Sequence, residues 1–163
     1  MTNIPKNSLI CTEEAIRLIN MDKYFVSKAD KKHIILPSGI ERTKTYYNLI
    51  SESEIEKFLI GFSTRNISIY RGCSTILRNE KHKNIPLFRI DLSKDKPHKN
   101  PNGQTIYGYH AHIYDEEYGD KIAIPLTEIF PELDDNARVD DVFKNFLKYC
   151  HVKDQPEVEL LVV

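Results

Sequence analysis

The sequence predicts a single α+β domain, built mainly on an antiparallel β-sheet, with an N-terminal helix and a C-terminal amphipathic helix packed on it. Helical periodicity appears near both ends of the chain, and short β-branched and aromatic runs separated by turn residues fill about residues 33–126. The length of 163 residues suits one domain and is enough to bury about two-thirds of the unfolded chain's surface. We therefore expect one domain over residues 1–163.

Helical signals mark the two ends of this domain. Thr12 suits an N-cap and is followed by two glutamates, which predicts a helix over about residues 12–22. Near the C-terminus, apolar residues recur at i, i+3, i+4, i+7, i+8 and i+11, which predicts an amphipathic helix over about residues 138–150. Pro156 prevents further helix, and residues 158–163 are expected to form an edge strand or a docked tail.

The first strands are expected between residues 33 and 63. Residues 33–36 and 42–49 are rich in β-branched and aromatic side chains, and Pro37, Ser38 and Gly39 predict a turn between them. Residues 51–63 carry conflicting signals, because two capping boxes favour a helix whereas alternating apolar residues favour a strand. We favour the strand.

Further strands are expected at residues 66–70, 73–78, 85–92 and 121–126. The strand over 85–92 places Leu87, Arg89 and Asp91 on one face. A turn at Pro101, Asn102 and Gly103 follows, because Asn-Gly tolerates positive φ. The return strand, residues 105–114, should place His110, His112 and Tyr114 together on one face.

Composition narrows the cellular setting. The cysteines are odd in number and lack C-x-x-C spacing, which argues against a disulfide framework or a thiolate zinc site and favours the cytoplasm. No apolar run is long enough to span a bilayer, so we expect no membrane association. The net charge of −1 hides an asymmetry, because residues 65–99 carry nine Lys/Arg against three acids, whereas residues 115–141 carry two against ten. The basic segment could attract a polyanion or simply form a solvated surface.

The residues that could carry chemistry lie between Arg89 and Lys121. Two histidines at i and i+2 of a strand lie within about 7 Å of each other, and imidazole titrates near neutrality. Such a pair can act as acid and base in the attack of a 2′-hydroxyl on its own phosphodiester, with nearby cations stabilising the developing charge. The candidate catalytic residues are His98, His110, His112, Arg89 and Asp91. The candidate substrate-binding residues are Lys99, Asn100, Lys121, Tyr114 and Arg71.

Two other interpretations of this cluster remain open. His98, His110 and His112 could bind a divalent metal together with a carboxylate from Asp91 or Asp120, and Asp120 could alternatively orient an imidazole. The histidines could also be structural, with their nitrogens satisfied by hydrogen bonds. An H-x-H pair alone does not discriminate among these interpretations.

The same region carries a resemblance to a known family. Residues 85–91 (IPLFRID), 97–103 (PHKNPNG), 110–114 (HAHIY) and 118–121 (YGDK) resemble a family of small, uncharacterised bacterial and prophage proteins. The pattern of that family is roughly PLxRxD, PHxNPDG and HxHIYxExYGD, and Asn102 replaces its more usual Asp. The resemblance favours an enzyme, because its polar positions fall where a site is expected, but it implies no particular activity.

Three functions follow as expectations. The first is a toxin-like, metal-independent endoribonuclease associated with mobile elements, which acts on RNA, needs no cofactor and has a possible antitoxin partner. The second is a phage-encoded inhibitor of host defence, similar to an anti-CRISPR protein, which binds a host or phage protein without catalysis. The third is a metal-dependent hydrolase or a small-ligand binding protein.

Overall fold

The computed structural model describes residues 10–38, 42–64, 72–82 and 85–162. The strand expected at residues 66–70 lies outside them. In chain order the elements are α1 (Thr12–Asn20), β1 (Lys23–Phe25), β2 (His33–Ser38), β3 (Thr43–Ser51), β4 (Lys57–Thr64), β5 (Cys73–Asn79), β6 (Ile85–Leu92), β7 (His98–Lys99), β8 (Thr105–Ile106), β9 (His110–Ile113), β10 (Ala123–Pro125), α2 (Leu126–Ile129), α3 (Val139–Tyr149) and β11 (Glu157–Val162).

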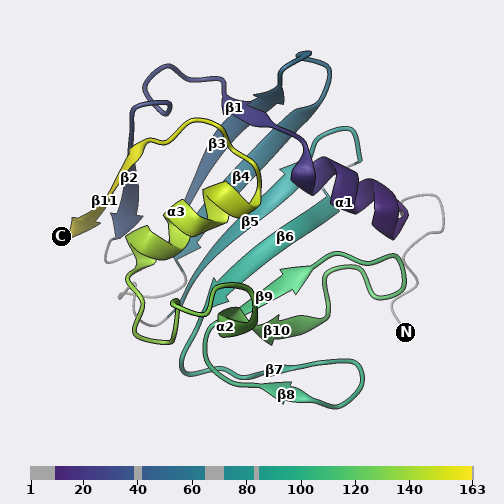
Figure 1. The fold of residues 1–163 in the computed structure, drawn as a ribbon. Helices are drawn as coiled ribbons and strands as arrows, with labels where there is room; N and C mark the ends of the chain where they lie inside the picture. Colours follow the sequence, from purple (N-terminus) through teal and green to yellow (C-terminus); the bar gives the residue numbers. More distant parts are fainter. Residues whose placement is uncertain (1–9, 39–41, 65–71, 83–84, 163) are drawn as a thin grey trace.

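A seven-stranded antiparallel sheet forms the centre of the fold, in the order β1-β3-β4-β5-β6-β9-β10 (Figure 1). The expected α+β class is therefore confirmed, and the strand favoured within residues 51–63 is present as β4. Two small pairs complete the strands: β7 with β8, and β2 with β11. The β2–β11 pair is parallel, so the tail forms an edge strand in a direction that the sequence pattern did not indicate.

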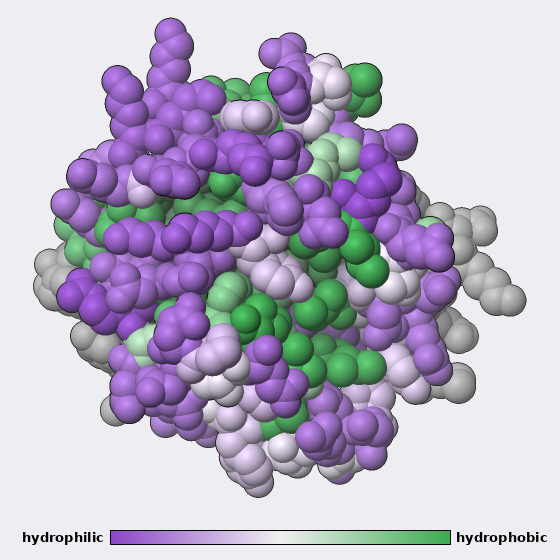
Figure 2. Space-filling model, viewed as in Figure 1, coloured by the Kyte–Doolittle hydropathy of each residue, from purple (hydrophilic) through white to green (hydrophobic). Residues whose placement is uncertain are grey.

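Both long helices cover the same face of the sheet (Figure 1). The rings of Phe143 and Phe146 on α3 lie 6.1 and 5.5 Å, between centroids, from those of Phe62 and Phe88 on the strands. Helix α1 buries Ala15, Leu18 and Ile19 in the same core. On this side of the molecule hydrophilic residues dominate the surface, with hydrophobic ones showing between them near the middle of the view (Figure 2). No helix in the described ranges is long and apolar enough to cross a membrane.

Several element boundaries differ from the sequence expectations. Helix α1 begins after Cys11, which is its N-cap, and the hydroxyl of Thr12 instead accepts a hydrogen bond from the backbone N–H of Glu116. The helix ends at Asn20, since Met21 is already extended. The strand expected over residues 121–126 is shorter, because Leu126 starts α2.

Strand β6 also departs from simple alternation. The pairing of β5 with β6 shifts register so that Phe88 faces Leu77 while Pro86 faces Arg78, which leaves Leu87 as the extra residue of a bulge. Leu87 is fully buried in the core. Its predicted position on the face of Arg89 was therefore wrong, because the bulge interrupts the alternation that the prediction assumed.

The predicted return strand over residues 105–114 is interrupted. The turn at residues 100–103 forms as expected, with Gly103 at φ 90°, but it closes only the short β7–β8 hairpin. The chain then turns at Gly108, at φ 76°, before β9 pairs with β6. The register of that pairing places His112 opposite Arg89 and His110 opposite Asp91, so these four side chains share the sheet face opposite the helices.

Candidate functional site

Three imidazoles converge at the end of the sheet where β6, β9 and the β7–β8 hairpin meet. The ring centroids of His98 and His112 lie 4.7 Å apart, those of His110 and His112 lie 5.1 Å apart, and those of His98 and His110 lie 5.6 Å apart. One ring nitrogen of each lies within 4.8 Å of the other two. The structure therefore brings together the three histidines that the sequence pointed to.

Each imidazole is held by a main-chain carbonyl. Nδ1 of His110 donates to the oxygen of Gly108 at 2.9 Å, Nδ1 of His112 to that of Asp120 at 2.7 Å, and Nε2 of His98 to that of Lys121 at 2.7 Å. A carbonyl oxygen only accepts hydrogen bonds, so these nitrogens carry the protons. In the neutral rings, Nε2 of His110, Nε2 of His112 and Nδ1 of His98 are therefore unprotonated.

A carboxylate and a guanidinium complete the cluster. Asp91 Oδ2 lies 3.3 Å from His112 Nε2 and 3.5 Å from His110 Nε2, and it accepts a hydrogen bond from Arg89 Nε at 3.1 Å. Arg89 also donates to Asp120 Oδ2 at 2.7 Å and lies 3.0 Å from His112 Nε2 through Nη2. The other oxygen of Asp91 is buried and has no hydrogen-bond partner among the described residues. Such an oxygen is costly to leave unpaired, so it is available to a bound cation or water.

The local electrostatics keep Asp91 and His98 in the forms that bind cations. Burial raises the pKa of Asp91, but hydrogen bonds from the imidazoles of His110 and His112, which can donate through Nε2 when a ring carries a second proton, and the charge of Arg89 outweigh it and hold that pKa well below its usual range. Burial and the neighbouring imidazoles also lower the pKa of His98, although the carbonyl of Lys121 acts in the opposite direction. At neutral pH, Asp91 is therefore ionised and His98 is neutral.

A hollow of about 260 Å³ opens beside the cluster, walled by Asp91, His98 and His110 together with Lys96 and Cys73. Lys96 is exposed and adds a positive charge at this opening. Burial, reinforced by the charge of Asp91, raises the pKa of the Cys73 thiol to about 12, so this cysteine is no nucleophile near neutral pH.

Only some of the predicted substrate-binding residues lie beside the histidine cluster. Asn100 is buried and pins the β7–β8 hairpin onto β10, since its side chain bonds both the carbonyl and the N–H of Ala123. Lys121 contributes the carbonyl that holds His98, and Lys99 is exposed on β7. Tyr114 does not join the site, because its buried hydroxyl donates to the carbonyl of Ile10. Arg71 lies outside the described residues.

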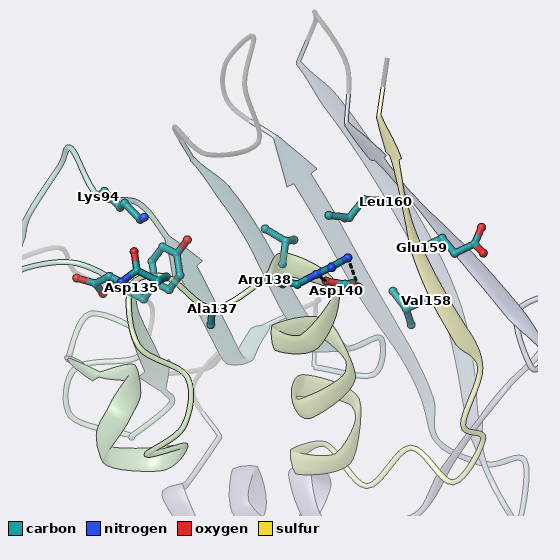
Figure 3. Close-up of a pocket in the computed structure, with 11 residues that line it drawn as sticks. Lys94, Asp135, Ala137, Arg138, Asp140, Val158, Glu159 and Leu160 are labelled. Atoms are coloured by element: carbon teal, nitrogen blue, oxygen red, sulfur yellow. Dashed lines mark hydrogen bonds and ion pairs between the residues drawn. The ribbon is translucent and has the colours of Figure 1, made fainter.

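A larger hollow, of about 700 Å³, lies elsewhere, between the start of α3, β11 and the loop that carries Asp135 (Figure 3). Arg138 is already paired there with Asp140. One residue of this hollow, Asp135, also holds the segment just before the histidines. Its Oδ1 accepts a hydrogen bond from the backbone N–H of Tyr109 at 2.9 Å. An added Cβ at Gly108 would collide with that carboxylate. Asp135 therefore fixes the turn whose carbonyl orients His110.

These supporting atoms cannot be predicted from residue identity, for two different reasons. The carbonyls of Gly108, Asp120 and Lys121 are main-chain groups, which leave no trace in residue identity. Asp135 lies 25 residues beyond His110, and only the glycine at position 108 hinted that something packs closely there.

Comparison with known proteins assigns the chain to a family. No curated protein and no solved structure matches the chain. A family model matches residues 10–152, a span that includes every residue of the histidine cluster. The expected membership of an uncharacterised family is thus confirmed, and the chain belongs to a family of unknown function (DUF6978).

Proposed function

We propose that the protein is a metal-dependent hydrolase with one divalent ion of the zinc type, bound by His98, His110 and His112. The observation that carries this proposal is the set of three imidazoles, each held through one nitrogen by a carbonyl, with one nitrogen of each ring within 4.8 Å of the other two and with Nε2 of His110 and of His112 at the same oxygen of Asp91. Histidines that bind metals are characteristically oriented in this way, since the second hydrogen bond fixes the tautomer and the ring.

The spacing favours a metal over acid–base catalysis without one. A tetrahedral zinc with Zn–N bonds of 2.0–2.1 Å has ligand nitrogens about 3.4 Å apart. The nitrogens here lie within 4.8 Å of one another, so small ring movements are enough to reach that geometry. An acid and a base hydrogen-bonded to opposite sides of a phosphate are separated by two bonds of about 2.8 Å plus the phosphate itself, which needs more than about 5.5 Å.

The surrounding charges suit hydrolysis of an anionic substrate. A divalent ion held by the three imidazoles would keep an open position and would lower the pKa of a bound water to about 7. Asp91 is ionised and lies against two of the three rings, so it can complete the ligand set or accept a proton from that water. Arg89 and Lys96 line the opening. Lys96 and the N–H groups of Arg89 that are not bonded to Asp91, Asp120 and His112 can hold a phosphoryl oxygen. The expected inhibitor of host defence stays a prediction without a supporting contact.

Elemental analysis of the purified protein tests the proposal. We expect about one zinc, manganese or iron ion per chain in the wild type and almost none in His98→Ala. His98 is the only one of the three with a partly exposed side chain, so its truncation should leave the fold intact by circular dichroism. His33→Ala is the matched control, because His33 is half-exposed and pairs with Glu159 away from the cluster.

Activity provides the second part of this test. Hydrolysis of a chromogenic phosphodiester should stop on chelation, return when metal is added, and be absent in His98→Ala. Folded wild-type protein that binds no divalent metal under any loading condition would overturn the proposal. Activity that survives complete chelation would restore the metal-independent alternative.

A further inference from the structure

We propose that the open face of the sheet binds single-stranded RNA and leads it to the histidine cluster. This inference rests on the proposed function, because it names the substrate class of the same site. The described elements leave this face uncovered from β3 to β5, where Tyr46 is 56% exposed. A hollow of about 420 Å³ lies over it.

The strand register joins this face to the site in two rows. Directly opposite residues in antiparallel strands point to the same side. One row runs across the sheet through Tyr46, Gly61, Ile76, Arg89 and His112. The adjacent row runs through Lys44, Ser63, Ser74, Asp91 and His110. Four strand spacings separate Tyr46 from His112, which is about 19 Å.

Tyr46 forms a flat platform at the far end of the first row. The position of an added Cβ at Gly61 lies 3.4 Å from Tyr46 Cε1 and 3.2 Å from Ile76 Cγ2, so the ring lies over the glycine beside Ile76. A ring that rests on the sheet in this way turns its other face to solvent. Bases of single-stranded nucleic acids stack on such exposed aromatic rings.

The charges of the face suit a phosphate backbone. The charged residues that line the hollow are Lys44, Arg78 and Arg89, of which Arg89 is already paired with Asp91 and Asp120, and none of the described acidic residues lines it. This local excess contrasts with the net charge of −1 for the whole chain. An acidic peptide would satisfy these cations as well, but its Asp and Glu side chains would offer no ring to stack on Tyr46.

Two further features favour RNA and join the face to the site. The hydroxyls of Ser63 and Ser74 make no hydrogen bond within the described ranges, and both belong to the row that ends at His110, where they can bond the 2′-hydroxyls that distinguish RNA from DNA. Ser74 and Arg89 also line the hollow beside the histidines, so the two hollows share a wall. A strand that crosses the face therefore reaches the cluster.

Fluorescence anisotropy with a labelled single-stranded RNA of about 10 nucleotides tests this proposal. We expect Tyr46→Ala to weaken binding by about 5- to 150-fold, the range that corresponds to loss of one stacked base. Tyr46→Phe keeps the ring and should bind as tightly as the wild type. Single-stranded DNA of the same sequence should bind more weakly than RNA.

The salt dependence of binding checks the role of the cations. The double variant Lys44→Ala/Arg78→Ala should reduce the slope of log K against log salt concentration by about 1.4, or about 0.7 for each phosphate that the protein no longer neutralises. Both side chains lie outside the histidine cluster, so metal content should be unchanged in this variant and in Tyr46→Ala.

The outcomes separate this proposal from the proposed function. Equal binding of RNA by Tyr46→Ala and the wild type, or displacement of RNA by polyglutamate at equal charge concentration, would overturn the RNA surface. Stoichiometric metal without RNA binding would also overturn it and leave the metal centre standing. RNA binding by protein that holds no metal would support the surface and remove the proposed function.

Discussion

Lys23, His110 and His112 are buried polar groups, and His98 is partly buried beside the two histidines. The hydrogen bonding of Lys23 differs from that of the histidines. The ammonium of Lys23 is fully buried, and its three hydrogens go to the carbonyls of Ile19, Met21 and Cys150 at 2.7–2.8 Å. Its Nζ also lies 4.6 Å from the centroid of the Phe58 ring. Every donor of this group is used, so its role is structural.

In the histidine cluster, only some of the polar atoms have a hydrogen-bond partner. Each imidazole gives one N–H to a carbonyl, and Nε2 of His110 and of His112 lie near Oδ2 of Asp91. Arg89 contacts both Oδ2 and Nε2 of His112, but the other oxygen of Asp91, Oδ1, has no partner in the described part of the chain. Buried polar groups in proteins are normally paired, so acceptors that are left together in one place indicate a ligand. Complete pairing therefore points to a structural role, and convergent incomplete pairing points to a site.

The largest expected effect is the loss of stability on substitution of Lys23. Lys23→Ala removes a packed side chain and leaves three buried carbonyls without a donor, which should lower the free energy of unfolding by about 3–5 kcal/mol. The measurement is urea unfolding at pH 7. A loss below about 1 kcal/mol would show that the ammonium contributes little and that complete pairing is no guide to structural importance.

The next largest effect is the pH dependence of stability that Lys23 causes. Burial lowers the pKa of Lys23 to about 8, whereas the lysine of the unfolded chain titrates near its ordinary pKa of 10.5. Between these values the unfolded state binds more protons, so the contribution of Lys23 to the free energy of unfolding should rise by about 3 kcal/mol as the pH increases through this window. The difference between wild type and Lys23→Ala isolates it, and a difference that stays flat from pH 8 to 10.5 would contradict it.

A smaller effect is expected at Asp135, which fixes the turn beside the histidine cluster. Asp135→Ala frees the N–H of Tyr109 and loosens the turn whose carbonyl holds His110. We expect metal affinity to fall by about 10- to 100-fold, as for other groups that orient metal ligands. Competition with a chromophoric chelator measures it. Asp135→Asn keeps an acceptor oxygen and should retain the affinity. Equal metal affinities for the wild type, Asp135→Ala and Asp135→Asn would show that Asp135 does not support the site.

The smallest expected effect concerns stability at the site. His98→Ala should change the free energy of unfolding of metal-free protein by less than about 1 kcal/mol, because the half-exposed ring gives up a single hydrogen bond. The same urea titration that is used for Lys23→Ala measures it. A loss comparable to that of Lys23→Ala would mean that the imidazole serves the fold.

Strand periodicity was enough to predict the shared face of His110 and His112, and antiparallel pairing with the strand of Arg89 was enough to bring it near them. The turn residues at 101–103 also predicted the loop that returns His98 to this face. Residue identity could not show the carbonyl anchors, the bulge at Leu87 or the parallel partner of β11, because these depend on main-chain geometry and long-range register. The burial of Lys23 was equally invisible, since a lone lysine is usually solvated.

X-ray absorption at the zinc edge of the zinc-loaded protein identifies the atoms that bind the metal. We expect a site with three imidazole nitrogens at about 2.0–2.1 Å and the loss of one of them in His98→Ala. A zinc environment that is unchanged in His98→Ala, or one without histidine nitrogens, would contradict it.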